Sequence, residues 1–225
     1  MEKKAFQDLV QTHSNKPVVM GYGNGKRFYE FDGNKFASVT TALSATKPQR
    51  DIDALQKWRD KVGEVEAARI SKESTERGTE MHDLAERYLK DNQQPISVRC
   101  DSIALFEQLI PELNKIDWYA LELFVCSKKL GLAGRLDCLG FYNNQLTLID
   151  FKTSTKKKYP SYITDYYIQV SIYAMMCEEL FDVQINKGLI LISTMGDGLQ
   201  TFEFNIDVWR DRVLSRVGEF HKKLA

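Results

Sequence analysis

The chain has 225 residues, of which 43% are hydrophobic and 28% are charged. This composition is typical of one globular domain with a sizeable buried core, and it argues against two domains with independent cores. The 31 Lys and Arg residues balance the 31 Asp and Glu residues, so the net charge is zero. The molecule as a whole therefore has no net attraction for nucleic acid or for an anionic membrane, and only local basic patches could provide one.

The sequence contains no pattern typical of a membrane span, a targeting peptide or a redox-active cysteine pair. The longest apolar run, residues 188–193, is far shorter than the roughly 20 residues of a bilayer-spanning helix. The first eight residues lack the apolar run of a secretory signal, and Glu2 and Asp8 disfavour a transit peptide. We therefore expect a cytoplasmic protein, of a bacterial cell or a virus-infected host, with no membrane association. No metal-binding or redox spacing occurs among the cysteines, so we expect reduced thiols and no iron-sulfur cluster at Cys100, Cys126, Cys138 and Cys177.

The N-terminal third predicts a hairpin followed by helices. Apolar and polar residues alternate over 17–31 around a glycine-rich turn at 21–25, which predicts a β-hairpin. A helical region begins at 38–44, and the spacing over 51–90 predicts two helices with a break near Gly63. The apolar residues of this region fall on two seams: one contains Leu55, Trp58, Val62, Val65 and Ala68, and the other contains Met81, Leu84, Ala85, Tyr88 and Leu89.

The remaining two thirds predict an α/β domain. Residues 143 and 144 are both asparagine, which tolerates positive φ, so the strands on either side should form a tight antiparallel hairpin. The expected order around it is αβββαβ with a mixed central sheet. The elements are a helix at 101–113, strands at 118–127, 134–142 and 145–152, a helix at 162–180, strands at 187–194 and 199–205, and a helix at 206–222.

Two acidic residues interrupt the apolar strands of this hairpin. Side chains alternate along a strand, so Asp150 and Lys152 project from one face of the third strand. Asp137 lies on the neighbouring strand, where antiparallel pairing can bring its carboxylate beside that of Asp150. Adjacent carboxylates repel each other unless a cation lies between them, and Mg²⁺ and Mn²⁺ prefer such oxygen ligands. The alternative is an exposed ion pair between Asp150 and Lys152, without a metal.

Five motifs in order resemble one family, the PD-(D/E)xK nuclease superfamily and, within it, the RecB-type exonuclease group. The motifs are G-T-x-x-H at 78–82, Glu122, G-R-x-D at 134–137, D-x-K at 150–152 and Q-x-x-x-Y at 169–173. More narrowly, residues 38–46, Trp58 and the segment 77–79 resemble the mitochondrial genome maintenance exonuclease group and its phage-encoded relatives. The resemblance implies a restriction-endonuclease-like fold, in which the early helices form an arch or lid for a single DNA strand.

The resemblance also implies the site residues. The metal ligands would be His82, Asp137, Asp150 and the backbone carbonyl of Phe151, and the catalytic residues would be Asp137, Asp150, Lys152, Glu122, Gln169 and Tyr173. Glu122 would hold a metal-bound water or a second ion. Lys152 would orient and deprotonate the attacking water, or stabilise charge on the phosphate. For His82, Glu122, Gln169 and Tyr173 the alternatives are ordinary surface or packing roles.

DNA is the expected substrate. Lys156, Lys157 and Lys158 follow the D-x-K motif directly and could bind phosphates, although such a run can also form a solvated loop. The further residues expected to contact DNA are Arg77, Thr79, Arg135, Thr153 and Ser154. Trp58 is better explained by packing than by stacking on a base.

The sequence thus predicts a Mg²⁺- or Mn²⁺-dependent deoxyribonuclease, an exonuclease acting on free ends of single-stranded DNA. Replication or recombination proteins are candidate partners. The alternatives are a structure-selective or double-strand end-resecting nuclease, and a non-catalytic nuclease-derived module for DNA binding or assembly. We expect one nuclease domain over 1–225, with an N-terminal elaboration at 1–75, the nuclease core at 76–195 and a C-terminal strand and helix at 196–225.

Overall fold

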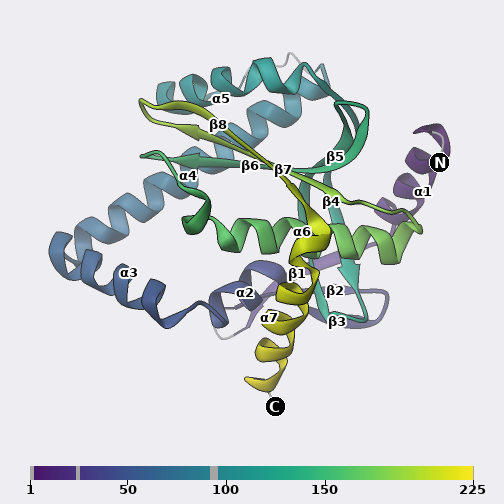
Figure 1. Cartoon of the computed structure of the whole chain (residues 1–225), viewed down its shortest axis with the longest axis horizontal. Helices are drawn as coiled ribbons and strands as arrows, with labels where there is room; N and C mark the ends of the chain where they lie inside the picture. Colours follow the sequence, from purple (N-terminus) through teal and green to yellow (C-terminus); the bar gives the residue numbers. More distant parts are fainter. Residues whose placement is uncertain (1–2, 24–25, 92–95, 225) are drawn as a thin grey trace.

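The computed structural model describes residues 3–23, 26–91 and 96–224 (Figure 1). Asn24 and Gly25 of the predicted turn, and the first two residues of the N-terminal segment, lie outside the described residues. The helices are α1 (Lys3–Ser14), α2 (Val39–Ala45), α3 (Gln49–Val62), α4 (Glu64–Leu89), α5 (Cys100–Leu113), α6 (Thr164–Phe181) and α7 (Arg210–Lys222). The strands are β1 (Val18–Gly23), β2 (Lys26–Phe31), β3 (Asn34–Ser38), β4 (Ile116–Ser127), β5 (Leu132–Tyr142), β6 (Gln145–Ser154), β7 (Lys187–Thr194) and β8 (Gly198–Asn205), and short 3₁₀ turns lie at Pro160–Tyr162 and Ile206–Trp209.

Strand β5 organises the sheet. The strand order is β1-β2-β3-β5-β6-β7-β8, and β4 pairs with β5 as well. One edge of β5 pairs with β4 along most of its length, whereas the other edge changes partner. It pairs in parallel with β3 at residues 132–133 and antiparallel with β6 at residues 138–142. Residues 134–137, the G-R-x-D motif, therefore have no strand partner on that edge among the described residues.

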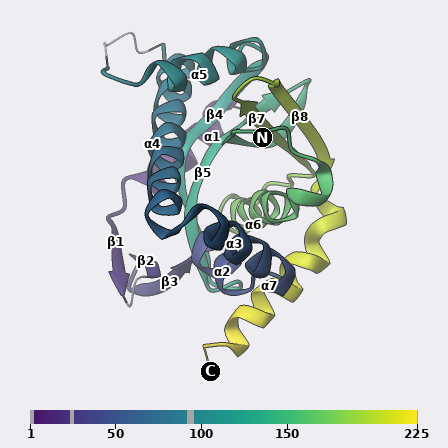
Figure 2. The same ribbon diagram turned by 90° about the vertical axis from the view of Figure 1, so that its left-hand side faces the viewer.

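Helices cover both faces of the sheet (Figure 2). On one face, α4 and α5 contribute Met81, Ala85 and Leu109 to a core shared with strands β5 to β7. On the other face, α6 is almost wholly enclosed by the sheet and by α1, α2 and α7, and ten of its 18 residues are buried. This three-layer arrangement confirms the predicted α/β class with a mixed central sheet. Within the described residues, no helix combines the length and the hydropathy needed to cross a membrane.

Most predicted elements are present at close to their predicted bounds. The N-terminal hairpin is confirmed, and the helical break lies at Gly63, whose φ of 87° favours glycine. Asn143 and Asn144 have φ values of 51° and 59°, as a tight two-residue turn requires. Helix α1 and strand β3 do not follow from the local pattern. Strand β3 is only five residues long, yet its parallel pairing with β5 joins the N-terminal hairpin to the main sheet.

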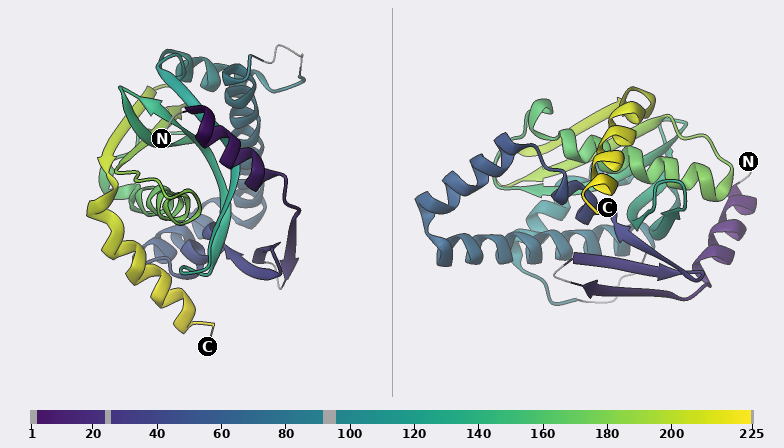
Figure 3. Two further views of the ribbon diagram at one scale, coloured as in Figure 1. Left: turned by 90° about the vertical axis from the view of Figure 1, so that its right-hand side faces the viewer. Right: turned by 90° about the horizontal axis from the view of Figure 1, so that it is seen from below.

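The apolar seam predicted on α3 does not pack against the core. Helix α3 has no buried residue, Leu55 is 43% exposed, and Val65 at the start of α4 is 87% exposed. The reason is tertiary: α3 and the first half of α4 meet at Gly63 and extend away from the sheet, so no layer covers the seam (Figures 1 and 3). An amphipathic period specifies an apolar stripe but not the surface that covers it.

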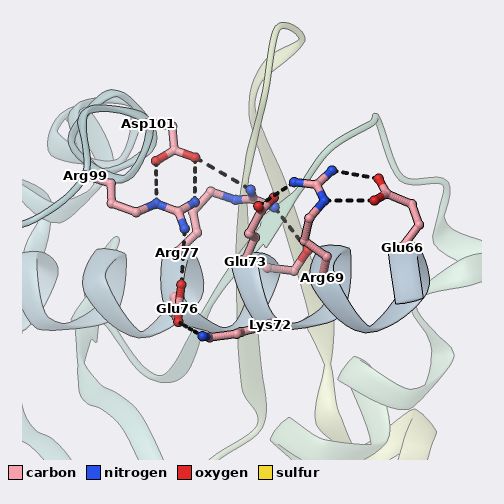
Figure 4. A network of polar contacts seen from close by, with 9 residues as sticks. Glu66, Arg69, Lys72, Glu73, Glu76, Arg77, Arg99 and Asp101 are labelled. Carbon is pink, nitrogen blue, oxygen red and sulfur yellow. Dashed lines mark hydrogen bonds and ion pairs between the residues drawn. The ribbon is translucent and has the colours of Figure 1, made fainter. Parts of the chain in front are cut away.

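A network of charged side chains joins α4 to the start of α5 (Figure 4). Arg77 of α4 is only 6% exposed, and its Nη1 lies 3.7 Å from the Asp101 carboxylate. Arg99 donates two hydrogen bonds of 2.9 and 3.1 Å to the same carboxylate. Arg77 was expected to contact DNA, but the structure instead encloses its guanidinium between two helices.

We predict that Arg77→Ala lowers the free energy of unfolding by roughly 1–3 kcal/mol, because it removes a buried side chain from the α4–α5 contact. Urea denaturation measures this change. Lys72→Ala is the matched control: Lys72 lies on the same helix, is 78% exposed and pairs only loosely with Glu76, so its loss should change stability by less than about 0.5 kcal/mol. An Arg77→Ala variant as stable as Lys72→Ala would contradict this assignment.

His13, in the last turn of α1, is a partly buried titratable residue. Its Nε2 lies 2.9 Å from the Phe124 carbonyl oxygen, and its ring packs among Phe31, Phe124 and Phe181. Burial among these rings lowers the pKa of His13 below its usual 6.5, although the hydrogen bond to Phe124 partly opposes this shift.

The shift predicts a pH-dependent stability. Below pH 6.5 the unfolded chain binds a proton at His13 more readily than the folded chain does, so stability is complete above that pH and falls as the pH falls toward the folded pKa. Urea denaturation of the wild type and of His13→Phe between pH 5.5 and 7.5 measures this. The wild type should lose stability relative to the variant as the pH falls, and parallel profiles would contradict the prediction.

Candidate active site

A cleft of about 700 Å³ lies between the N-terminal hairpin, α4, α6 and strands β4 to β6. Eight of the predicted site residues line it. They are Thr79 and His82 of α4, Glu122 of β4, Arg135 and Asp137 of β5, Lys152 of β6, and Gln169 and Tyr173 of α6. Residues separated by almost 100 positions in the sequence therefore share one cavity.

The base of the cleft forms where β5 and β6 separate. Their ladder ends at the pair Cys138 and Ile149, one residue before Asp137 and Asp150. Beyond this point the Asp137 Oδ2 accepts a hydrogen bond of 2.7 Å from the Phe151 backbone N–H. A side-chain carboxylate thus replaces the backbone carbonyl that would continue the ladder. This contact holds the two strands apart by the length of a side chain and directs the other Asp137 oxygen into the cleft.

His82, Glu122 and Asp137 form a cluster, with one potential ligand atom from each within 4.8 Å of the others. The His82 Nδ1 lies 3.6 Å from an Asp137 oxygen and 4.0 Å from a Glu122 oxygen. The His82 Nε2 lies 2.7 Å from the Phe151 carbonyl oxygen, to which it can only donate. In the neutral imidazole, Nδ1 therefore keeps its lone pair and faces the carboxylates.

Asp150 and Lys152 form the second part of the site. Asp150 is 1% exposed, and its Oδ2 contacts the Lys152 ammonium. No further hydrogen-bond partner is found for this oxygen in the described part of the chain. Burial raises the pKa of Asp150 to about 6, while the charge of Lys152 opposes that shift. Burial alone would lower the pKa of Lys152, but the negative charges of Asp150 and Asp137 outweigh it and raise the pKa.

Glu122 reaches the cluster through an unusual backbone conformation. It has a φ of 46° in the middle of β4, a left-handed conformation that costs a non-glycine residue on the order of 1–3 kcal/mol. The Arg135 guanidinium donates a hydrogen bond of 2.9 Å to the Glu122 carbonyl oxygen and so supports this conformation. Burial, followed by the charge of Asp137, raises the pKa of Glu122 to about 7.

The donor set fits a hard divalent cation. The carboxylates of Glu122 and Asp137 converge with the imidazole of His82, and the Asp150–Lys152 pair lies on the neighbouring strand β6. Burial raises the pKa values of Glu122 and Asp150. Such a group is stabilised by a cation with oxygen and nitrogen ligands, as Mg²⁺ and Mn²⁺ are.

The structure assembles the predicted ligand set only in part. His82 and Asp137 lie together, and Glu122 joins them. Asp150 instead pairs with Lys152, and the Phe151 carbonyl already accepts from His82. This hydrogen bond uses one of the two lone pairs of the carbonyl oxygen.

Gln169 and Tyr173 lie on the face of α6 that is turned toward β5. Gln169 hydrogen-bonds the Tyr173 side chain, and burial raises the pKa of the Tyr173 phenol. A Cβ added at Gly134 would come within 2.7 Å of the Tyr173 ring and hydroxyl, so glycine is needed at that position for the tyrosine to fit. At Gly78, by contrast, an added Cβ would meet Thr153 at 3.7 Å, an ordinary contact. The space around Gly78 therefore does not require a glycine.

The residues expected to bind DNA fall into separate groups. Thr79 and Arg135 are exposed in the cleft, and Thr153 is half-buried beside it. Ser154 is 8% exposed, and its hydroxyl closes the turn by bonding both the backbone N–H and the carbonyl of Lys156. Lys156 and Lys157 are exposed and Lys158 is half-buried, and none has a carboxylate partner within 4 Å among the described residues.

The backbone of the lysine run is held in place by β8 and the turn before it. The N–H of Lys157 donates to Asp197, and the N–H of Lys158 donates to Gln200. The run is therefore a fixed segment with its two exposed ammonium groups in solvent.

The sequence interpretation missed the N-terminal side of the cleft. Met20 of β1, Arg27 and Tyr29 of β2 and Thr40 of α2 also line it. The alternation that predicts the hairpin does place Met20, Arg27 and Tyr29 on one face. Nothing local, however, indicates that this face lies against the cleft.

Comparisons with known proteins were made for the whole chain. No family model matches it. It is 28% identical to mitochondrial genome maintenance exonuclease 1 of Mus musculus over 173 residues, covering 71% of this chain and 50% of that protein. It is 26% identical to the protein of the same name of Xenopus tropicalis over 207 residues, covering 83% and 57%. A putative exonuclease of Eubacterium rectale shows a TM-score of 0.44 at 10% identity, with 63% of each chain covered.

The two similarities in sequence relate the chain to proteins named exonucleases. The chain spans about half the length of the curated relatives it matches.

Proposed function

We propose that this chain is a divalent-metal-dependent deoxyribonuclease of the PD-(D/E)xK superfamily, an exonuclease that acts on free ends of single-stranded DNA. The observation that carries the proposal is the separation of β5 from β6 at Asp137, which gathers His82 and Glu122 around one carboxylate beside the Asp150–Lys152 pair. The similarity to exonucleases supports the substrate class.

The side chains have distinct roles in phosphodiester hydrolysis. His82, Glu122, Asp137 and Asp150 would hold Mg²⁺ or Mn²⁺, which when bound acidifies water and neutralises charge on the scissile phosphate. Lys152 is held in the cleft by Asp150, so its ammonium can position the attacking water or stabilise charge on the phosphate. Tyr173 and Gln169 fix the surface of β5 behind Asp137.

The preference for a free single strand is the finer part of the proposal. The paired helices α3 and α4 extend beyond the sheet (Figures 1 and 3). Helix α4 also lines the cleft, and α3 has no buried residue. Such an uncovered helical pair is suited to act as an arch over a threaded strand. A linear single strand should then be degraded while a circular single strand is spared. Comparable rates on linear duplex ends would instead favour double-strand end resection.

We predict that Asp150→Asn and Lys152→Ala each lower the cleavage rate by at least about 10²-fold, because they remove a ligand and a buried cation at the reacting phosphate. The measurement is a time course on end-labelled linear DNA with Mg²⁺, Mn²⁺ or a chelator. Lys129→Ala is the control, since Lys129 is an exposed lysine in the turn between β4 and β5. Cleavage by Asp150→Asn at the wild-type rate would reject this centre, and a wild type without activity on any DNA would leave the non-catalytic alternative.

Metal binding should be measurable without DNA. We predict that Mn²⁺ binds the wild type and raises its melting temperature, because a ligand that binds only the folded state stabilises it. Asp137→Asn keeps an oxygen that can accept from Phe151 but removes the charge, so its Mn²⁺ affinity should fall at least about tenfold. Asp83→Asn, an exposed carboxylate next to His82 but outside the cluster, should bind as the wild type does. Calorimetric titration that finds equal affinities for all three proteins would exclude a metal at this cluster.

A further inference from the structure

The inner face of the N-terminal hairpin continues beyond the cleft. In the antiparallel pair of β1 and β2, Met20 lies opposite Tyr29 and Tyr22 lies opposite Arg27, so these four side chains share one face. Met20, Arg27 and Tyr29 line the catalytic cleft. Tyr22 and Arg27 line a second cavity of about 580 Å³, between the hairpin, α2 and α7. Arg27 and Thr40 belong to both cavities, which therefore adjoin each other.

The two cavities differ in charge. The catalytic cleft contains the carboxylates of Asp83, Glu86, Glu122 and Asp137. The second cavity contains no carboxylate among its lining residues, and it contains the cations Lys26, Arg27 and Lys223 as well as several hydroxyl groups. Lys223 is partly neutralised by Glu219 at 3.1 Å. In the described part of the chain, Lys26 and Arg27 have no carboxylate within 4 Å.

Arg27 lies at the boundary between the cavities. Its Nη2 donates 2.8 Å to the Thr40 hydroxyl, and its guanidinium lies 5.8 Å from the centre of the Tyr29 ring. Its Nε is buried and has no hydrogen-bond partner among the described residues. A buried donor without a partner is costly, and its cost is reduced if an anion is bound nearby.

Apolar side chains on this face are exposed. Met20 is 53% exposed and Tyr22 is 68% exposed, whereas Tyr29 on the same face of β2 is buried. Exposed aromatic and thioether groups beside unpaired cations are the combination that binds single strands, because bases stack on the former while phosphates approach the latter. A duplex cannot use such a surface, since its bases are already stacked on one another.

We infer that the inner hairpin face and the second cavity form a binding track for single-stranded nucleic acid, continuous with the catalytic cleft through Arg27 and Thr40. The inference rests on the proposed function, because it takes the cleft as the place of reaction. Bases would stack on Tyr22 and Met20, and phosphates would lie along Lys26 and Arg27. The hairpin and β8, which holds the lysine run at 156–158, lie at opposite ends of the strand order, so the track adds a contact that the motifs do not indicate.

The test measures binding and catalysis separately. Fluorescence anisotropy with an end-labelled 20-nucleotide oligo(dT) in chelator gives the affinity without cleavage. The double variant Met20→Ala, Tyr22→Ala should bind at least fivefold more weakly than the wild type. Val19→Ala is the matched control, because Val19 is 57% exposed on the other face of the same strand, and it should bind within twofold of the wild type. Lys26→Gln should reduce the dependence of affinity on salt concentration.

Steady-state kinetics on the same oligonucleotide with Mn²⁺ complete the test. The double variant should show a KM raised at least fivefold and a kcat within twofold of the wild type, with an unchanged melting temperature. If the wild type binds and cleaves but the double variant matches it in affinity and KM, the track is overturned while the nuclease function stands. A variant that loses kcat at unchanged KM would likewise overturn the track. If the wild type neither binds nor cleaves a single strand, both proposals fail.

Discussion

The candidate site depends on one hydrogen bond, from the backbone N–H of Phe151 to the carboxylate of Asp137. Strands β5 and β6 are joined by a two-residue turn and pair regularly for five positions, and this bond marks the point where they separate. Because the separation is one side chain wide, Asp137 of β5 can bond β6 through one carboxylate oxygen while its other oxygen remains in the cleft. His82, Glu122 and Tyr173 all contact or approach the short stretch of β5 and β6 that this contact defines.

Charge is unevenly distributed in this molecule of zero net charge. The negative charges are concentrated at the separation of the strands, where burial raises the pKa values of Glu122 and Asp150. Lys26 and Arg27 line the second cavity, and the exposed Lys156 and Lys157 follow the Asp150–Lys152 pair in the chain. This separation of negative from positive charge favours binding of a cation at the centre and of phosphates around it. The net charge of the chain indicates neither kind of binding.

The N-terminal segment is part of the site although it contains none of the five motifs. The short parallel contact of β3 with β5 carries the hairpin to the open side of the cleft. On β5 this contact uses residues 132 and 133, which come immediately before the G-R-x-D motif at 134–137. The attachment of the hairpin and the opening of the cleft therefore follow from the same change of partner along β5.

Local pattern was sufficient to determine most of the elements, although not α1 or β3, and part of the site. Strand alternation placed Asp150 with Lys152, and the two asparagines of the turn set the register that brings Asp137 beside them. Only the tertiary structure decided which side chains are buried and which groups form hydrogen bonds with one another. Arg77 is buried between two helices, and the apolar seam of α3 is exposed to solvent. The Phe151 carbonyl accepts a hydrogen bond from His82, and Glu122 has a positive φ. The physical reason is that periodicity fixes the direction of a side chain relative to its own element, whereas burial, pairing and strain depend on elements distant in the sequence.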